Sequence, residues 1–217
     1  MCADALRRVR GPEPGDGLER SLLAGGLRLV AGVDEVGRGA WAGPLSVGVA
    51  TFDVAGLAGV PIGLRDSKLL SPARREALFP ALASSCHGFA VGHASPAECD
   101  ELGMTAALGV AAGRALAALE EAPDVVVVDG PRDFTGHERH LAVVGGDRTS
   151  VVIAAASVLA KVTRDRILVE ASARLPGYGF ERNKGYATPE HRRAVARLGT
   201  SVLHRRSWTF ARPLAPG

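Results

Sequence analysis

Cysteine and aromatic residues are scarce in this chain. Its 217 residues include three cysteines, Cys2, Cys86 and Cys99, and only 5% aromatic side chains. Because three is an odd number and no CxxC pair occurs, neither a disulfide framework nor a zinc site is expected. Gly and Pro together make up 40 residues (27 plus 13), fewer than in a low-complexity protein.

Long apolar segments are also missing. No run of about 18 apolar residues without charge occurs, so we expect no transmembrane helix. Residues 1–17, MCADALRRVRGPEPGDG, lack the apolar core of a signal peptide. These absences favour a cytoplasmic protein without membrane contact. The formal net charge of +3 permits a nucleic-acid partner but does not establish one.

What is present suits one globular domain with a sizeable core, at 47% hydrophobic and 23% charged residues. We expect residues 1–18 to form a disordered arm, because prolines and glycines interrupt them. Residues 19–217 should form a single domain, with a helical C-terminal extension from about 176 to 217. A short helix is predicted over 18–26.

Valine-rich segments predict the strands. Residues 27–36 and 45–54 are separated by a short glycine-rich gap, which favours antiparallel pairing. Residues 124–130, DVVVVDG, fit a strand that is buried on both faces and covered by helices. Residues 140–147 predict a short strand that ends in an acid.

Hydroxyl residues before prolines predict helix starts at Ser71 and Ser95. The second of these helices is expected to run on to Leu119. A long helix over 150–175 and one from Thr188 to Gly199 follow. Strands that alternate with helices indicate an α/β layered domain.

Four acids lie where strands are predicted to end: Asp34, Glu35, Asp129 and Asp147. If these strand ends converge, the mutual repulsion of the carboxylates requires cations. Carboxylate oxygens suit Mg²⁺ or Mn²⁺, and two such ions about 4 Å apart activate water and stabilise the leaving oxygen of a phosphodiester. The alternative is that each acid is a solvated turn residue, because Asp-Gly is ordinary turn chemistry.

One geometric objection concerns Asp34 and Glu35. Adjacent residues of a regular strand point to opposite faces, so the two side chains cannot both face one site. A twist or bulge near Gly37 is therefore expected to turn both of them toward the metals.

Seven motifs resemble those of bacterial ribonuclease HII in order and spacing: AGVDEVGRG (31–39), DSKLLS (66–71), VVDG (127–130), GD (146–147), AAASVLAKVTRD (154–165), GYGFERNKGYATPEH (177–191) and HRRSW (204–208). The resemblance covers roughly residues 18–210. Ordered motifs of this kind are far more specific than a lone GRG.

This resemblance implies a ribonuclease H-like fold, with a central mixed five-stranded sheet flanked by helices. It implies an endoribonuclease that hydrolyses the RNA strand of RNA–DNA hybrids and takes part in ribonucleotide excision repair. Incision would fall 5′ of single ribonucleotides in duplex DNA and leave 3′-hydroxyl and 5′-phosphate ends. Asp34, Glu35, Asp129 and Asp147 would be the catalytic, metal-binding carboxylates, with Mn²⁺ or Mg²⁺ as the cofactor.

The same resemblance implies that the turn Gly37-Arg38-Gly39 reads the ribonucleotide. Glycine lets the backbone approach the sugar and hydrogen-bond its 2′-hydroxyl. Tyr186 would pack on the next sugar and favour deoxyribose there. The alternatives are an ordinary hairpin turn with an exposed arginine and a half-buried core tyrosine.

Further substrate-binding residues are expected to line the groove. Basic side chains would supply affinity without sequence preference, and serines would donate to phosphates. These residues are Ser67, Lys68, Lys161, Lys184, Arg205, Arg206 and Ser207. Arg164 and Asp165 are expected mainly to fix their helix, Tyr178 to be structural, and Arg192, Arg193 and Arg197 to be solvated.

The sequence departs from the family pattern at two positions, of which Trp208 in place of the usual phenylalanine is expected to be a neutral aromatic exchange. Gly145 stands where the family usually has a lysine, which puts rate and metal affinity in doubt rather than reaction type.

Three alternative functions share parts of this pattern. Ribonuclease HIII usually carries an extra N-terminal domain, for which about 30 residues before the first strand leave no room. A hybrid-binding protein would not need four intact acids. A small-substrate phosphatase would not need the basic C-terminal segment or Tyr186. A monomer is the default expectation.

Overall fold

The computed structural model describes residues 13–207. A five-stranded sheet forms its centre, in the order β3-β2-β1-β4-β5. The strands are β1 (Val30–Val36), β2 (Leu45–Phe52), β3 (Gly88–Ala94), β4 (Val125–Asp129) and β5 (His140–Val143). β2 runs antiparallel to β1 and β3, whereas β4 runs parallel to β1 and β5. The mixed five-stranded sheet and the antiparallel first pair are confirmed.

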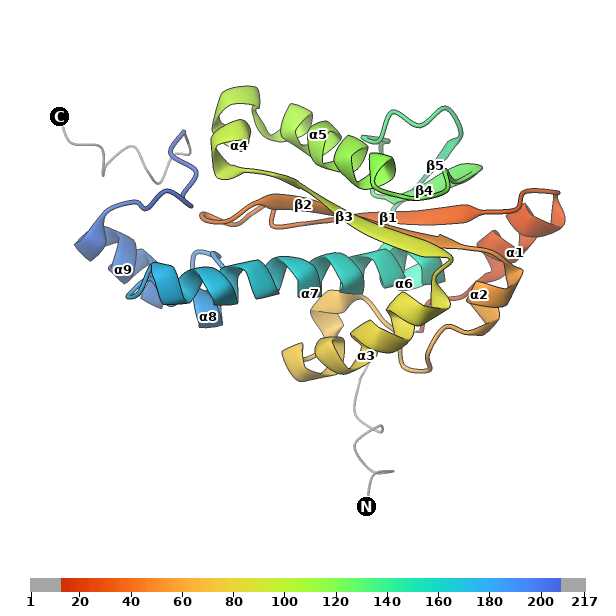
Figure 1. The fold of residues 1–217 in the computed structure, drawn as a ribbon, viewed down its shortest axis with the longest axis horizontal. Helices are drawn as coiled ribbons and strands as arrows, with labels where there is room; N and C mark the ends of the chain where they lie inside the picture. The colour runs from red at the N-terminus through yellow and green to blue at the C-terminus, as the bar shows by residue number, and fades with distance from the viewer. Residues whose placement is uncertain (1–12, 208–217) are drawn as a thin grey trace, which may run out of the picture.

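Helices cover both faces of this sheet (Figure 1). One face carries α4 (Pro96–Leu102) and α5 (Met104–Ala117), and the other carries α7 (Val151–Arg174), against which α3 (Pro72–Ser85) packs. The remaining helices are α1 (Gly17–Ala24), α2 (Val54–Ala58), the 3₁₀ turn η1 (Ser67–Leu69), α6 (Gly146–Thr149), α8 (Phe180–Asn183) and α9 (Pro189–Leu198).

Small residues allow α7 to lie close to the sheet. A Cβ atom on Gly32 of β1 would stand 2.1 Å from the backbone carbonyl group of Val152, and one on Gly48 of β2 would stand 2.6 Å from the Ala156 carbonyl oxygen. No real Cβ tolerates such distances, so glycine is required at both positions. The close approach brings the start of α7 against the ends of β1 and β4, where the acids lie.

Capping residues in the sequence predicted the starts of several helices correctly. Ser71 caps α3 and Ser95 caps α4 with a full capping box to Glu98. The helix expected to run from Pro96 to Leu119 is instead two helices, because Gly103 between them adopts φ 76°. β3 was not predicted, since GFAVGHA carries only a weak strand signal.

The expected N-terminal arm lies partly outside the described residues. Its described part, residues 13–18, packs on the domain rather than extending from it. Gly15 donates to the carbonyl of Thr149 and accepts from Val151 N–H, and Gly17 begins α1. Glu19 of α1 is fully buried and accepts from the Ser150 hydroxyl at 2.5 Å. This segment therefore braces the loop that carries Asp147.

The described part of the C-terminal extension forms one end of the molecule. α8, α9 and the segment up to Ser207 lie beside the turn between β1 and β2 (Figure 1). A separate apolar cluster, which includes Leu168, Tyr178 and Phe180, holds this end together. Among residues 13–207, no helix combines the length and apolar character that crossing a bilayer requires.

Candidate active site

Asp34 and Asp129 lie side by side at the ends of parallel strands. The register pairs Val33 with Val128, so the next residue of each strand is an acid. Successive side chains of a strand point to opposite faces, so residues an even number of positions apart share a face. Val30 lies four residues before Asp34, Val127 lies two before Asp129, and both valines pack on the α7 side. Both acids therefore face α7.

Asp147 joins these two acids from α6. The Gly146 N–H donates to Asp129 Oδ1 at 2.7 Å, which brings the next residue against the end of β4. Asp147 does not end a strand as predicted, because β5 stops at Val143 and Asp147 belongs to a four-residue helix. Asp129 thus has Asp34 on one side, at the end of the neighbouring strand, and Asp147 on the other.

Glu35 is placed differently. Glu35 lies two residues after Val33 and so shares its face of the sheet, which packs on the α5 side. β1 pairs with β2 without interruption through Val36. The expected bulge is absent, because Gly37 follows the strand rather than interrupting it. The Glu35 N–H donates to Asp34 Oδ1 at 2.8 Å, and its carboxylate lies 3.6 Å from Arg38 Nη1.

Burial and like charge perturb the acids on the α7 side. Asp34 is only 4% exposed. Its burial, opposed by a hydrogen bond from Ser157 and reinforced by the charges of Glu35 and Asp129, raises its pKa to about 7. Burial and the charge of Asp147 also raise the pKa of Asp129. Both carboxylates therefore lie where an added positive charge would stabilise them.

A lysine already supplies one such charge. Lys68 Nζ lies 3.1 Å from Asp147 Oδ2. Burial acts to lower the pKa of Lys68, but the hydrogen bond and the charge of Asp147 outweigh it, so the pKa is raised. In this structure Lys68 serves as a counter-ion of the acids rather than as a free phosphate contact.

The acids fit a hard divalent cation. Their donors are all carboxylate oxygens, as Mg²⁺ and Mn²⁺ prefer, and the ammonium of Lys68 stands beside Asp147 where a cation is needed. Among residues 13–207, no three acid, histidine or cysteine side chains already converge into a ligand cage. Asp34, Asp129 and Asp147 are the carboxylates on the α7 side that could hold such an ion.

Ser67 and Ser157 connect η1 to α7 above Asp34. The two hydroxyls hydrogen-bond at 2.8 Å, and Ser67 is 4% exposed. The expectation that Ser67 binds phosphate is therefore wrong in this structure, because its hydroxyl is buried and engaged. No role was predicted for Ser157, although a serine in the alanine-rich stretch 154–160 is a signal of a polar contact.

The turn after β1 is built as a tight loop. Gly37 adopts φ 86°, and a Cβ there would stand 2.2 Å from Arg164 Nε. Arg38 and Gly39 are exposed at the tip. The turn Gly37-Arg38-Gly39 thus begins two residues beyond Glu35, with Gly37 buried and Arg38 and Gly39 at the surface.

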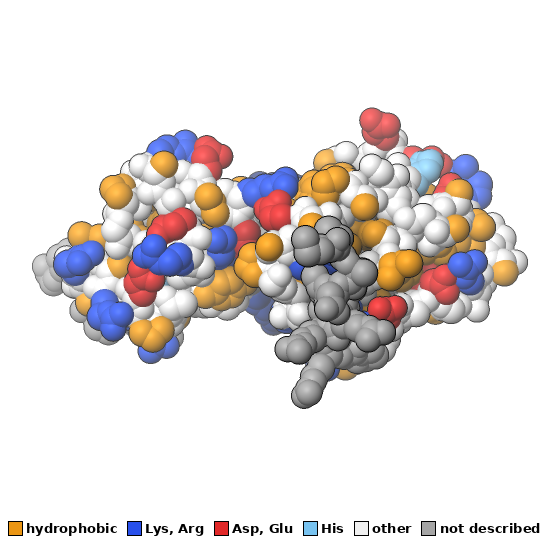
Figure 2. All heavy atoms as spheres, turned by 90° about the horizontal axis from the view of Figure 1, so that it is seen from below, with side chains coloured by type: hydrophobic (Ala, Val, Ile, Leu, Met, Phe, Trp, Pro, Cys, Tyr) orange, Lys and Arg blue, Asp and Glu red, His pale blue; other side chains and the backbone are white. Residues whose placement is uncertain are grey.

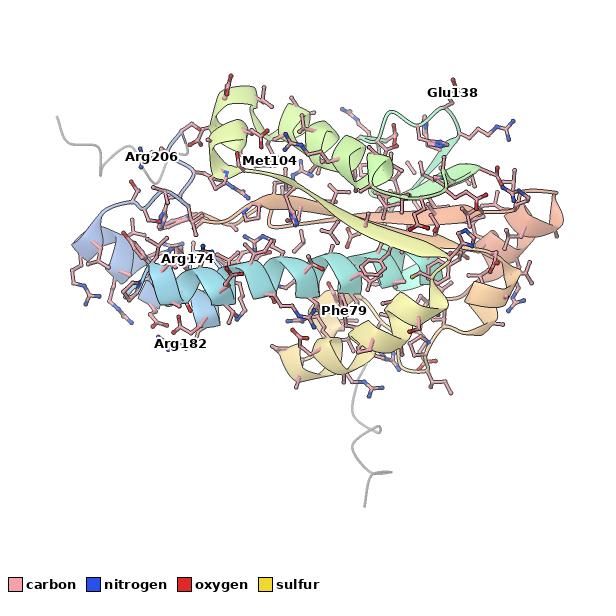
Figure 3. All side chains as sticks on the ribbon, in the orientation of Figure 1. Phe79, Met104, Glu138, Arg174, Arg182 and Arg206 are labelled. Carbon is pink, nitrogen blue, oxygen red and sulfur yellow. The ribbon has the colours of Figure 1, made fainter. Side chains whose placement is uncertain are left out.

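Arg205 does not line a groove as predicted. It is fully buried and donates to the carbonyls of Gly37 and Arg38 at 2.6 and 2.9 Å. Burial lowers its pKa to about 10. Arg206 and Ser207 are exposed, and their backbone N–H groups donate to Asp100 of α4. Figure 3 shows Arg206 at the same end of the molecule as α4.

Tyr186 lies half-buried over two cations. Lys161 Nζ and the guanidinium carbon of Arg164 are each 5.4 Å from the centre of its ring. Lys161 is paired with Asp165 at 2.5 Å and is mostly covered, so it supports the ring more than it faces a groove. Lys184 is half-buried in a left-handed conformation, φ 50°, and its ammonium donates to the Glu181 carbonyl.

Other cations at this end are neutralised by acids. Figure 2 shows Lys and Arg side chains mixed with Asp and Glu over the end that carries α8 and α9. Arg182 pairs with Glu181 and Glu190, and Arg174 with Glu170. Arg193 and Arg197 are exposed, and Tyr178 is buried. Arg192 is exposed too, but it is not simply solvated, because its Nε donates to the Ala187 carbonyl and its guanidinium lies 5.4 Å from the centre of the Trp41 ring.

Two buried histidines support the tyrosine loop. The Ser201 N–H donates to His204 Nδ1, so His204 Nε2 carries the proton that is shared with His191 Nε2 at 3.1 Å. His191 Nδ1 then donates to the Tyr186 carbonyl at 2.9 Å. A second proton on either ring would break this series of hydrogen bonds.

Acid should therefore weaken the fold through His204. Burial and the neighbouring His191 lower the pKa of His204 to about 4. The stability from its neutral form is present above pH 6.5 and is lost as the pH falls toward 4. We expect the difference in unfolding free energy between wild type and His204→Gln, measured by urea titration, to shrink by about 3 kcal/mol between pH 7 and pH 4. A difference that stays constant over this range would contradict the prediction.

The sheet order and the acids at the ends of its central strands define the ribonuclease H-like class. A family model described as Ribonuclease HII matches residues 31–211. Ribonuclease HII of Streptomyces avermitilis is 48% identical over 89% of this chain and 82% of its own length. The structure of ribonuclease H2 from Pyrococcus horikoshii OT3 is 31% identical, has a TM-score of 0.74 and covers 86% of this chain and 96% of that chain.

A structure of Bst-RNase HIII in complex with Mn²⁺ shares the fold at 19% identity and a TM-score of 0.63, and covers 85% of this chain and 68% of its own. The chain belongs to the ribonuclease HII family. It is thus an endoribonuclease that cleaves the RNA strand of RNA–DNA hybrids, in a family that uses divalent metal ions. The resemblance inferred from the motifs is confirmed.

Proposed function

We propose that this enzyme incises duplex DNA on the 5′ side of a single embedded ribonucleotide and leaves 3′-hydroxyl and 5′-phosphate ends. The acids Asp34, Glu35, Asp129 and Asp147 would hold two divalent ions, Mn²⁺ or Mg²⁺, and for Glu35 this requires its side chain to turn from the α5 side of β1 toward the other three. When bound, such ions activate the attacking water and stabilise the leaving oxygen. Location in the cytoplasm, a role in ribonucleotide excision repair and a monomeric state stay predictions.

The observation that carries this proposal is the continuity between the acids and the turn. Gly37-Arg38-Gly39 follows β1 directly, so its backbone lies within a few residues of Asp34. A group that reads the 2′-hydroxyl has to lie close to the scissile phosphate, because the two are parts of one nucleotide. Backbone donors at a glycine turn meet this need.

Tyr186 supports a preference for a junction. Its half-buried ring rests on Lys161 and Arg164, and its loop is bonded to the turn, because Trp41 and Ala42 N–H groups donate to the Gly185 carbonyl at 2.8 and 3.1 Å. A rigid ring held at a set distance from the turn can pack on the sugar that follows the ribonucleotide. A 2′-hydroxyl on that sugar would collide with the ring.

The test uses a DNA duplex with one ribonucleotide, an all-DNA duplex and a long RNA–DNA hybrid, each with Mg²⁺ or Mn²⁺. We expect one incision 5′ of the ribonucleotide and none in the all-DNA duplex, with both product ends identified by mass spectrometry. Cleavage of the long hybrid alone would refute the junction activity and leave a specificity of the ribonuclease HIII kind.

A further inference from the structure

Two arginines are buried beneath the turn. Arg164 of α7 and Arg205 of the C-terminal segment are both 0% exposed. Placing a guanidinium in the interior is costly unless hydrogen bonds compensate. Here backbone carbonyls of the residues between the strands β1 and β2 accept hydrogen bonds from both guanidinium groups.

Arg205 determines which way two peptide groups face. It donates to the carbonyls of Gly37 at 2.6 Å, Arg38 at 2.9 Å and Gly43 at 3.3 Å. All described peptide bonds are trans, and in a trans peptide the N–H points opposite to the C=O. With both carbonyls turned inward, the N–H groups of Arg38 and Gly39 point outward, where both residues are exposed.

The guanidinium also polarises these peptides. A positive charge at the carbonyl end strengthens the donor at the N–H end, because consecutive hydrogen bonds reinforce one another in a medium of low dielectric constant. The outward N–H groups are therefore both oriented and made stronger donors toward an oxygen on the substrate.

Arg164 joins the turn to the tyrosine loop. It donates to the carbonyls of Ala42, Pro44 and Lys184, each at 2.9 Å. The first two belong to the segment that leads from the turn into β2, and Lys184 lies two residues before Tyr186. One planar group thus sets the spacing between the two parts of the proposed ribonucleotide reader.

We propose that Arg205 and Arg164 are the positioning residues for ribonucleotide recognition: Arg205 orients the donors of the turn, and Arg164 sets their distance from Tyr186. This inference rests on the proposed junction activity. Neither side chain needs to touch the substrate. Lysine preserves the charge but has a single nitrogen without the planar fork, so it cannot hold three carbonyls in this geometry.

The test compares Arg205→Lys and Arg164→Lys with Arg166→Lys. Arg166 lies on the same helix but is exposed and pairs with Glu76 at 2.5 Å. Steady-state kinetics are measured on the single-ribonucleotide duplex and corrected for the folded fraction from urea titration. We expect kcat to fall about 10- to 100-fold in the two buried variants, because small displacements of a positioned group have effects of this size. KM should change little, since affinity comes mainly from phosphate contacts.

A second measurement separates positioning from general damage. The rise in melting temperature on adding Mn²⁺ should match that of wild type in every variant, because the acids are untouched. Unchanged kcat in a folded Arg205→Lys or Arg164→Lys, or a Mn²⁺ response lost together with kcat, would overturn the inference. If Arg205→Lys leaves too little folded protein for kinetics, the kcat of Arg164→Lys tests the inference. Failure of the wild type to incise the duplex would instead refute the proposed function.

Discussion

Asp34→Asn should abolish incision and at the same time stabilise the metal-free protein. Asparagine keeps the size and shape of the side chain but removes its charge. Asp34 lies beside Asp129 at the ends of parallel strands, 4% exposed. Metal ions contribute several kcal/mol to transition-state stabilisation in such sites, so activity should fall by about 10³-fold or more.

The gain in stability follows from the pKa of about 7 for Asp34, which is raised mainly by burial. A carboxyl group whose pKa is raised by folding stabilises the fold below its unfolded pKa of 3.8, and this contribution is lost as the pH rises through 7. At pH 8 the charge costs up to about 4 kcal/mol. Asparagine carries no charge and avoids this cost.

The measurement combines incision of the single-ribonucleotide duplex with urea unfolding in EDTA at pH 8. Asp16→Asn is the matched control, because Asp16 is at the surface and pairs with Arg20 at 2.7 Å. The control should leave both properties near those of wild type. A fully active Asp34→Asn, or one that is less stable than wild type at pH 8, would contradict the prediction.

Gly37→Ala should damage both the fold and the incision. Gly37 has φ 86°, where an L side chain is strained, and a Cβ would lie 2.2 Å from Arg164 Nε and 2.8 Å from the Pro44 carbonyl. Strain costs about 1–2 kcal/mol and overpacking about 1–3 kcal/mol. We expect a loss of about 2–5 kcal/mol in unfolding free energy and a fall in kcat of about 100-fold.

Gly39→Ala offers a matched comparison for the stability part. A Cβ on Gly39 meets no atom within 4 Å, so the unfolding free energy of Gly39→Ala should stay within the error of wild type. Urea titration of both variants gives the stability change, and kinetics on the folded fraction gives kcat. Equal stability of the two variants would contradict the prediction. It would show that the turn shifts to accept a Cβ at Gly37 without strain or overpacking.

Local sequence signals predicted what depends on a few neighbouring residues. The hydroxyl caps at Ser71, Ser95 and Thr188 start helices as expected, and the run of valines in 125–128 is a buried strand. The break at Gly103 was missed because an isolated glycine in an alanine-rich stretch does not by itself end a helix. β3 was missed because its partly buried pattern depends on its pairing with β2.

The candidate site likewise has residues that the sequence pattern predicted and residues whose roles it did not predict. Recurrence of acids after valine-rich runs pointed to Asp34 and Asp129, because that pattern can be read from the sequence itself. That the two acids lie side by side depends on the parallel pairing of β1 with β4. Arg205 was misassigned, since a sequence does not show whether an arginine faces phosphate or a buried carbonyl. Lys68 was expected only to line the substrate groove, and its pairing with Asp147 was not predicted, because that contact depends on how η1 packs over α7.

By itself the sequence determined the α/β class, the caps and valine strands that form the elements, and the chemical kind of the site, four acids beside a glycine turn. These properties depend on residue type and short spacing. Only the tertiary structure decided that Asp147 stands on a helix, that Glu35 lies on the other face of β1, and that Arg164 and Arg205 hold the turn from below. Those outcomes depend on contacts between residues such as Gly37 and Arg205, which lie 168 positions apart, and no local pattern records such a contact.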